Sequence, residues 1–203
     1  MGGWPGALAQ VIEQCLNRNV DNEVFRPFMH RGFPWQTPTR ENPPGRAYFS
    51  GLQKNDGKGV NGTGTYPFTG DCDRIENGSH TTNVPRPPNE PQNTINGFAL
   101  DCMAQFKLGY YFVVQSIHHR RYPVVDAERG VVWSHAIFDQ GTVNKGVLST
   151  GQEYTFRGFN RPSSILVNEA FLIENGKIRR VEMVGPGTTY HTNSPWPGNL
   201  SGN

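Results

Sequence analysis

The chain has 203 residues and a mass of 22.7 kDa, which is enough for one domain with a substantial core. Only 35% of the residues are hydrophobic and the mean hydropathy is −0.59, and no run approaches the roughly 18 apolar residues of a membrane helix. The net charge is +2 and the longest basic cluster is 118–121, which argues against nucleic acid as a partner.

The first half of the chain is predicted to be helical and rich in loops, because Gly and Pro are frequent there and in the tail. Residues 6–17 show the apolar spacing of a short amphipathic helix, and residues 98–108 show it again, with Gln105 on the apolar side. The other segments are an aromatic, Pro-rich stretch (25–45), a second helix (46–54), a loop (55–70), a short strand and turn (71–82) and a loop (83–96).

Long β-like runs follow at 110–125 and 130–139, and a Gly-rich connection (140–162) leads to a strand pair at 165–173 and 177–184. Helices followed by a curved antiparallel meander predict an α+β fold. The domain is expected to cover 46–196, after an N-terminal arm (1–45) and before a tail (197–203).

Asn175-Gly176 between the last two strands predicts a hairpin with a two-residue type I′ turn, since both residues tolerate positive φ. The turn fixes the expected register of the two strands. The predicted pairs are Glu174 with Lys177, Ile173 with Ile178, Phe171 with Arg180, and Glu169 with Glu182.

Two carboxylates directly opposite each other are destabilising, so the pair of Glu169 and Glu182 needs an explanation. The first is a cation nearby or a carboxyl with a raised pKa, as in an acid/base site. The second is a solvated face on which Arg180 screens both charges. In the third, the cavity lies on the other face of the sheet and is lined by Asn168 and Met183.

Four residues are candidates for catalysis: His135, Glu169, Glu182 and Tyr190. His135 shares a strand face with Trp133, which we expect to point into the core. A His and a buried Glu that line one apolar cavity would form a workable acid/base set, with Tyr190 near the end of the domain as a hydrogen-bond donor. The alternatives are that His135 is a satisfied core residue and that Tyr190 serves only in packing.

Arg74 and Glu76 share a strand face and are candidate substrate-binding residues, or else an ordinary ion pair that fixes a loop. Arg120 and Arg121 point to opposite faces, so only one could enter a pocket, and a bridge to an acidic residue of the 126–128 turn is the alternative. The remaining candidates for substrate binding are Tyr48, Tyr111, Trp133 and His191.

The sequence contains no phosphate-binding Gly loop, dinucleotide fingerprint or zinc-protease motif, so we predict no cofactor and no metal. His118 and His119 are adjacent, and adjacent side chains on a strand diverge. Of the three cysteines, Cys72 and Cys102 could form a disulfide if the protein is exported, which would leave Cys15 unpaired. The compartment, cytoplasmic or exported, stays open.

Four motifs carry a resemblance to a known family: F-x-x-D-C-x-R-x-E-N-G (68–78), R-R-x-P-V-V-D-x-E-R-G (120–130), F-x-I-x-x-G-K-I-R (171–179) and a segment that contains Tyr190 and Trp196. With these the chain resembles the nuclear transport factor 2-like (SnoaL-like) superfamily, and within it a largely uncharacterised bacterial and fungal branch. The resemblance implies a cystatin-like α+β barrel: a cone-shaped curved sheet around the helices, with a pocket at the wide end.

Members of this superfamily include cofactor-free isomerases, dehydratases and lyases, and also proteins that only bind ligands or subunits. One similar group cleaves lignin-derived diaryl compounds and releases formaldehyde. The resemblance therefore implies a cofactor-independent lyase for a small, hydrophobic, aromatic molecule. The alternatives are a dehydratase or isomerase of polyketide- or terpenoid-like molecules, and a non-catalytic binding or subunit-contact protein. A homo-oligomer, dimer or trimer, is also expected.

Overall fold

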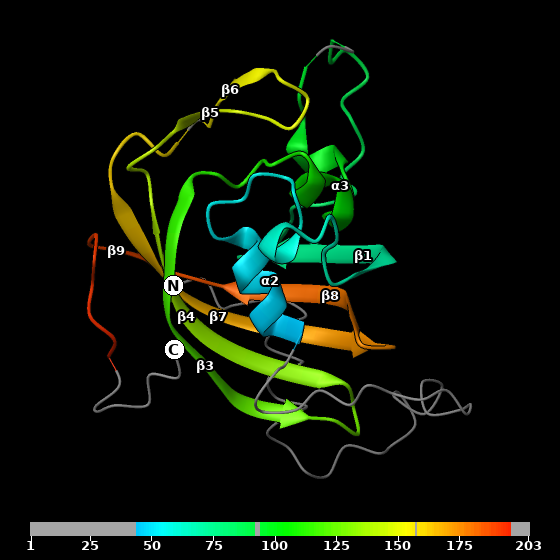
Figure 1. Ribbon diagram of the computed structural model, residues 1–203, viewed down its shortest axis with the longest axis vertical. Helices are drawn as coiled ribbons and strands as arrows, with labels where there is room; N and C mark the ends of the chain where they lie inside the picture. Colours follow the sequence, from blue (N-terminus) through cyan, green and yellow to red (C-terminus); the bar gives the residue numbers. More distant parts are fainter. Residues whose placement is uncertain (1–43, 92–93, 157, 196–203) are drawn as a thin grey trace, which may run out of the picture.

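A large curved sheet and a few short helices make up the mixed α+β fold (Figure 1). The computed structural model describes residues 44–91, 94–156 and 158–195. The helix expected over 6–17, nearly all of the predicted arm and the predicted tail lie outside these residues. None of the helices in the described ranges has the length and apolar character needed to cross a membrane.

The two helices expected within the described residues are confirmed, although the first begins and ends two residues earlier than predicted and the second is shorter. Helix α2 covers Pro44–Leu52, and helix α3 covers Cys102–Lys107. Asp101 caps α3, because its side chain accepts a hydrogen bond from the Ala104 N–H at 2.7 Å. Two 3₁₀ turns, η2 (Val60–Gly62) and η3 (Gly97–Ala99), complete the helical part.

The main sheet has the strand order β2-β1-β8-β7-β4-β3, and β9 also pairs with β7. All pairs are antiparallel except β1 and β8, which run parallel. The strands are β1 (Phe68–Glu76), β2 (Ser79–His80), β3 (Val114–Asp126), β4 (Val131–Gln140), β7 (Ser163–Glu174), β8 (Lys177–Val184) and β9 (Gly187–Thr188). The connection before β7 contains a separate small hairpin of β5 (Lys145–Val147) and β6 (Glu153–Thr155).

The predicted hairpin is present as β7 and β8, with Asn175 and Gly176 in the turn at φ values of 51° and 72°. The first two predicted pairs, Glu174 with Lys177 and Ile173 with Ile178, are confirmed. Both turn residues therefore adopt the left-handed conformation that a type I′ turn requires.

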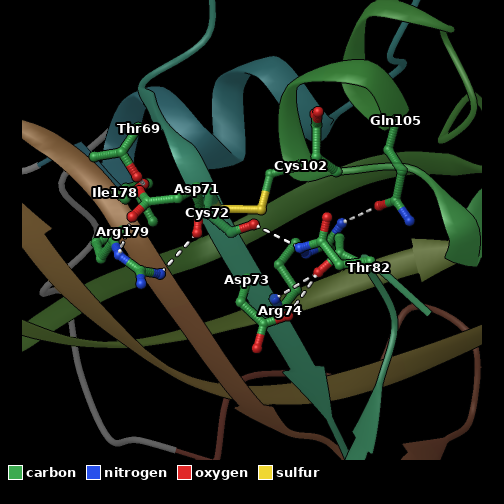
Figure 2. Close-up of a disulfide and its surroundings, with 12 residues drawn as sticks. Thr69, Asp71, Cys72, Asp73, Arg74, Thr82, Cys102, Gln105, Ile178 and Arg179 are labelled. Carbon is green, nitrogen blue, oxygen red and sulfur yellow. Dashed lines mark hydrogen bonds and ion pairs between the residues drawn. A yellow bond between two sulfur atoms is a disulfide. The ribbon is translucent and has the colours of Figure 1, made fainter. Parts of the chain in front are cut away.

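A β-bulge then shifts the register of this hairpin. Ile173 pairs with Ile178, but its neighbour Leu172 pairs with Arg180, which leaves Arg179 as an extra residue. The side chain of Arg179 forms an ion pair with Asp71 of β1 at 3.0 Å and donates to the Asp71 backbone carbonyl at 2.7 Å (Figure 2). The extra residue is thus held by the neighbouring strand.

The bulge makes two of the predicted pairs wrong, because every later pair moves by one position. Phe171 lies opposite Val181, and Glu169 lies opposite Met183. A shift by one residue exchanges the two faces of a strand. Glu169 and Glu182 therefore lie on opposite faces of the sheet and do not form a pair.

We call the face of the sheet that packs on α2 the inner face, and the opposite one the outer face. Tyr48 of α2 contacts Phe171 of β7 with ring centroids 5.1 Å apart, and Phe49 contacts Phe138 of β4 at 5.6 Å. These contacts belong to the hydrophobic core, which lies between α2, α3 and the inner face (Figure 1).

The prediction that His135 and Trp133 point into the core is wrong. The inner-face residues of β4 are the alternate set that includes Val132 and Phe138, which are part of the core cluster. His135 and Trp133 lie on the outer face. Apolar side chains occupy both faces of β4, so alternation along its sequence did not identify the inner one.

A disulfide joins Cys72 of β1 to Cys102 at the start of α3 (Figure 2). This is the pairing expected if the protein is exported. Because Cys72 follows Asp71, the partner of the bulge residue Arg179, the disulfide and the bulge fix neighbouring positions of β1.

Candidate functional site

Charged side chains from β1 and β7 meet on the inner face of the sheet. Arg74 lies opposite Val181 of β8, and Glu76 lies opposite Met183, which in turn lies opposite Glu169 of β7. Glu76 and Glu169 thus share one row across three strands, with backbones about 10 Å apart, as expected from the strand spacing. Arg74 and Glu169 are almost fully buried.

The guanidinium of Arg74 is the centre of this cluster. Its Nη1 donates to Gln105 Oε1 at 3.0 Å and to the Tyr111 hydroxyl at 2.5 Å, and its Nη2 forms an ion pair with the Glu76 carboxylate. The guanidinium carbon lies 4.9 Å from the ring centroid of Tyr111 and 5.7 Å from that of Tyr48. The ion pair of Arg74 and Glu76, which was the alternative to substrate binding, is therefore present, and aromatic rings surround it.

Gln105 is a member of the cluster that the sequence analysis did not select. Its amide nitrogen donates to the Gly97 carbonyl at 2.6 Å and to the Thr81 carbonyl, and its oxygen accepts from Arg74 and Tyr111. Figure 2 shows Gln105 and Arg74 beside the disulfide. Its position on the apolar side of a predicted helix could have identified it, because a buried polar side chain needs hydrogen-bond partners.

The carboxyl of Glu169 has a strongly raised pKa. Burial raises the pKa of Glu169 to about 8, although the positive charge of Arg74 acts in the opposite direction. The Tyr48 hydroxyl is close enough to lower this pKa somewhat, but it does not reach hydrogen-bond geometry. At neutral pH Glu169 is therefore mostly a neutral carboxylic acid, which can donate a proton.

Three buried polar atoms of this cluster have no hydrogen-bond partner among the described residues: Glu169 Oε2, the Tyr48 hydroxyl and Arg74 Nε. Burial also raises the pKa of Tyr48 well above its usual value and that of Tyr111 to about 12. Both hydroxyls therefore keep their protons at neutral pH. The cluster offers an acid, two phenols and a fixed cation within an apolar surrounding.

The cluster reaches the surface at Glu76, whose side chain is 23% exposed, whereas that of Arg74 is almost fully buried. Glu76 is the last residue of β1, and the turn that follows it contains Asn77 and Gly78. Solvent is thus in contact with the cluster at Glu76, whereas Arg74 and Glu169 are buried.

The structure does not bring the four predicted catalytic residues together. Glu182 lies on the outer face, where its Oε1 accepts a hydrogen bond from Arg180 Nε at 2.7 Å. His135 lies opposite Asn168 of β7, also on the outer face, and burial lowers its pKa. Tyr190 packs its ring on His191, with centroids 4.1 Å apart. Of the four, only Glu169 belongs to the inner-face cluster.

The predicted substrate-binding residues divide in a similar way. Those in the cluster are Arg74, Glu76, Tyr48 and Tyr111. Trp133 is on the outer face beside His135. Arg120 instead joins β3 to α2 and to the residue after it, because it donates to Ser50 Oγ and Gln53 Oε1, both at 3.0 Å. His191 lies at Asp139 of β4, 3.0 Å from its carboxylate.

A family model matches the chain over residues 42–185, and it is described as Domain of unknown function (DUF8021). The match contains every member of the inner-face cluster and ends before Tyr190 and His191. No curated protein matches the chain. Since the match covers most of its length, the chain belongs to the DUF8021 family.

Proposed function

We propose that the protein is a cofactor-independent enzyme in which Glu169 transfers a proton to and from a small, hydrophobic, aromatic molecule. The observation that carries this proposal is a fully buried carboxyl with a pKa of about 8 and an unpaired oxygen, beside the Tyr48 hydroxyl and the guanidinium of Arg74. The resemblance to the nuclear transport factor 2-like superfamily, with its cone-shaped sheet and pocket, is part of the proposal.

The unpaired atoms support a functional interpretation because they destabilise the fold. A buried donor or acceptor without a partner costs about 1–3 kcal/mol. Here three such atoms, on Glu169, Tyr48 and Arg74, belong to one cluster. Polar groups that stay buried at such a cost, with strongly shifted pKa values, are typical of functional sites.

Because Glu169 is protonated at neutral pH, it would first act as an acid and then as a base. Neutral Glu169 is poised to protonate an oxygen that departs from, or becomes anionic in, the substrate. The carboxylate that remains is stabilised by Arg74 and can then remove a proton from the substrate, which restores the acid. Tyr48 can donate a hydrogen bond to the same oxygen. A proton donated and a proton taken back are the elements of an elimination or an isomerisation.

The aromatic surroundings favour an aromatic substrate. Phe106 and Phe171 pack around Tyr48, with ring centroids 5.4 and 5.1 Å away. Such rings favour stacked or edge-to-face contacts with another aromatic group. The resemblance adds lignin-derived diaryl compounds as the first substrate class, so we propose a lyase before a dehydratase or isomerase.

The test combines binding and turnover. Thermal-shift measurements with lignin-type dimers, phenolic acids and polyketide-like rings would identify ligands, and formaldehyde release would then be measured for the diaryl compounds that bind. We expect Glu169→Gln to lower turnover at least ~100-fold. Tyr48→Phe should have a smaller effect. Glu182→Gln is the matched control, because it makes the same substitution on the outer face.

Turnover by Glu169→Gln equal to that of the wild-type protein, with unchanged circular dichroism, would refute the role of Glu169. Binding of several compounds without turnover of any would instead favour the non-catalytic binding protein. In that case Glu169→Gln should alter affinity and Glu182→Gln should not.

A further inference from the structure

We propose that His118, Asp139 and His191 form a binding site for a divalent transition-metal ion of the Zn²⁺ class. His118 comes from β3, Asp139 from β4, and His191 from the segment after β9. One ligand atom of each side chain lies within 4.8 Å of those of the other two. The site lies on the outer face and is separate from the Glu169 cluster, so it goes beyond the proposed function.

The two histidines converge on a single carboxylate oxygen. Asp139 Oδ2 lies 3.1 Å from His118 Nε2 and 3.0 Å from His191 Nδ1. Two ligand atoms bound tetrahedrally to one Zn²⁺ ion at 2.0–2.2 Å are about 3.3–3.6 Å apart. Both nitrogens lie slightly closer to the oxygen than this, so a small rotation of the two imidazoles would make room for the ion. Neutral imidazoles and one carboxylate are a typical ligand set for Zn²⁺ and Fe²⁺.

Ser164 of β7 holds this arrangement in place. Its hydroxyl donates to Asp139 Oδ1 at 2.6 Å and accepts the backbone N–H of His191 at 3.1 Å. One oxygen of Asp139 is thereby occupied and the other is directed at the two imidazoles. Both Asp139 and Ser164 have an exposed fraction of 0%. Metal sites typically have such an outer hydrogen bond, which orients the ligand.

The charges also favour a cation. Asp139 is fully buried, and its ion-pair partners among the described residues are the two imidazoles of His118 and His191. A buried carboxylate needs a compensating charge. A dication between the three side chains supplies this charge while both imidazoles stay neutral.

The site is open on one side. The side chain of His118 is 28% exposed and that of His191 is 65% exposed, so an ion can enter and leave. Three protein ligands leave at least one coordination position for water or another molecule. Such open sites are typical of catalytic rather than structural zinc.

The experiment is a calorimetric titration of the full-length protein with ZnCl₂ after treatment with a chelator. We expect one Zn²⁺ ion per chain. His191→Gln should weaken binding at least ~tenfold, and because His191 is exposed this variant should fold. His118→Gln should do the same. Co²⁺ provides a second readout, since its visible absorption bands should appear with the wild-type protein and not with His191→Gln.

The matched control is His80→Gln, because His80 pairs with Asp73 at 3.2 Å but has no second histidine in the pair. This variant should bind Zn²⁺ like the wild-type protein. The proposal is overturned if the wild-type protein binds no Zn²⁺. It is also overturned if His191→Gln binds as tightly as His80→Gln, as would happen if the ion were bound by Cys15.

Discussion

The raised pKa of Glu169 makes a quantitative prediction about the pH dependence of stability. In the unfolded chain this carboxyl has its ordinary pKa of 4.5, and in the folded protein it has a pKa of about 8. Above pH 4.5 the unfolded chain releases a proton that the folded protein still holds. The unfolded state is therefore increasingly favoured as the pH rises, until Glu169 itself ionises near pH 8.

The size of the effect follows from the two pKa values. Each pH unit in this window lowers the free energy of unfolding by about 1.4 kcal/mol, so Glu169 alone should remove about 2.5 kcal/mol between pH 5 and pH 7. Glu169→Gln keeps the shape of the side chain and does not titrate. The difference in free energy of unfolding, wild type minus variant, should fall by this amount over the same range.

Urea unfolding at a series of pH values from about 5 to 9 would measure this difference, because the linear extrapolation gives the free energy in water. Glu182→Gln is the matched control for loss of a strand carboxyl on the outer face. If the difference between the wild-type protein and Glu169→Gln is the same at pH 5 and pH 7, Glu169 does not hold its proton in the folded state. The proposed role as an acid at neutral pH would then fail as well.

Three further predictions concern the fold around the site. Replacing both Cys72 and Cys102 by Ser should lower the free energy of unfolding by about 3.5 kcal/mol, the loop-closure value for a separation of 30 residues, and reductant should have this effect only on the wild-type protein. Arg74→Met should lower the free energy of unfolding measured in urea by about 3–5 kcal/mol, because it leaves the buried partners of the guanidinium unpaired. Gly130→Ala should cost more than about 1 kcal/mol in the same assay, since Gly130 has a φ of 66° and an added Cβ would lie 2.5 Å from the Ile173 carbonyl oxygen. An unchanged unfolding midpoint in any of these variants would contradict the corresponding contact.

The β7–β8 hairpin could be predicted from the local sequence only near its turn. Asn175-Gly176 was sufficient to predict the turn and the first two pairs, because the conformation of those two residues decides them. The bulge at Arg179 was not predictable in this way. Its extra residue contacts Asp71, which belongs to a strand far away in the sequence. One extra residue exchanges the faces of all the residues of β8 beyond it relative to the predicted pairs.

The candidate site was also predicted only in part, because some of its contacts depend on residues far apart in the sequence. Arg74 and Glu76 are predicted together because they alternate on one strand, whereas Glu169 was chosen for an expected pairing with Glu182 that the structure does not have. The role of Glu182 depended on the register beyond the bulge, which was wrong. The pairing of β3 with β4 follows from the predicted meander, but the register shifts between these strands, which help to set where His118 lies relative to Asp139, do not.

The parallel pairing of β1 with β8 has a consequence for the way in which the protein is made. Every strand between them must be synthesised before β1 meets β8, so Arg74 acquires its partner Val181 only after β2 to β7 have been made. Contacts of such long range slow folding. Until then, β1 presents an edge with unpaired backbone groups, which is prone to aggregation. A chain truncated before β8 would retain that edge permanently, and with it a half-assembled cluster around Arg74.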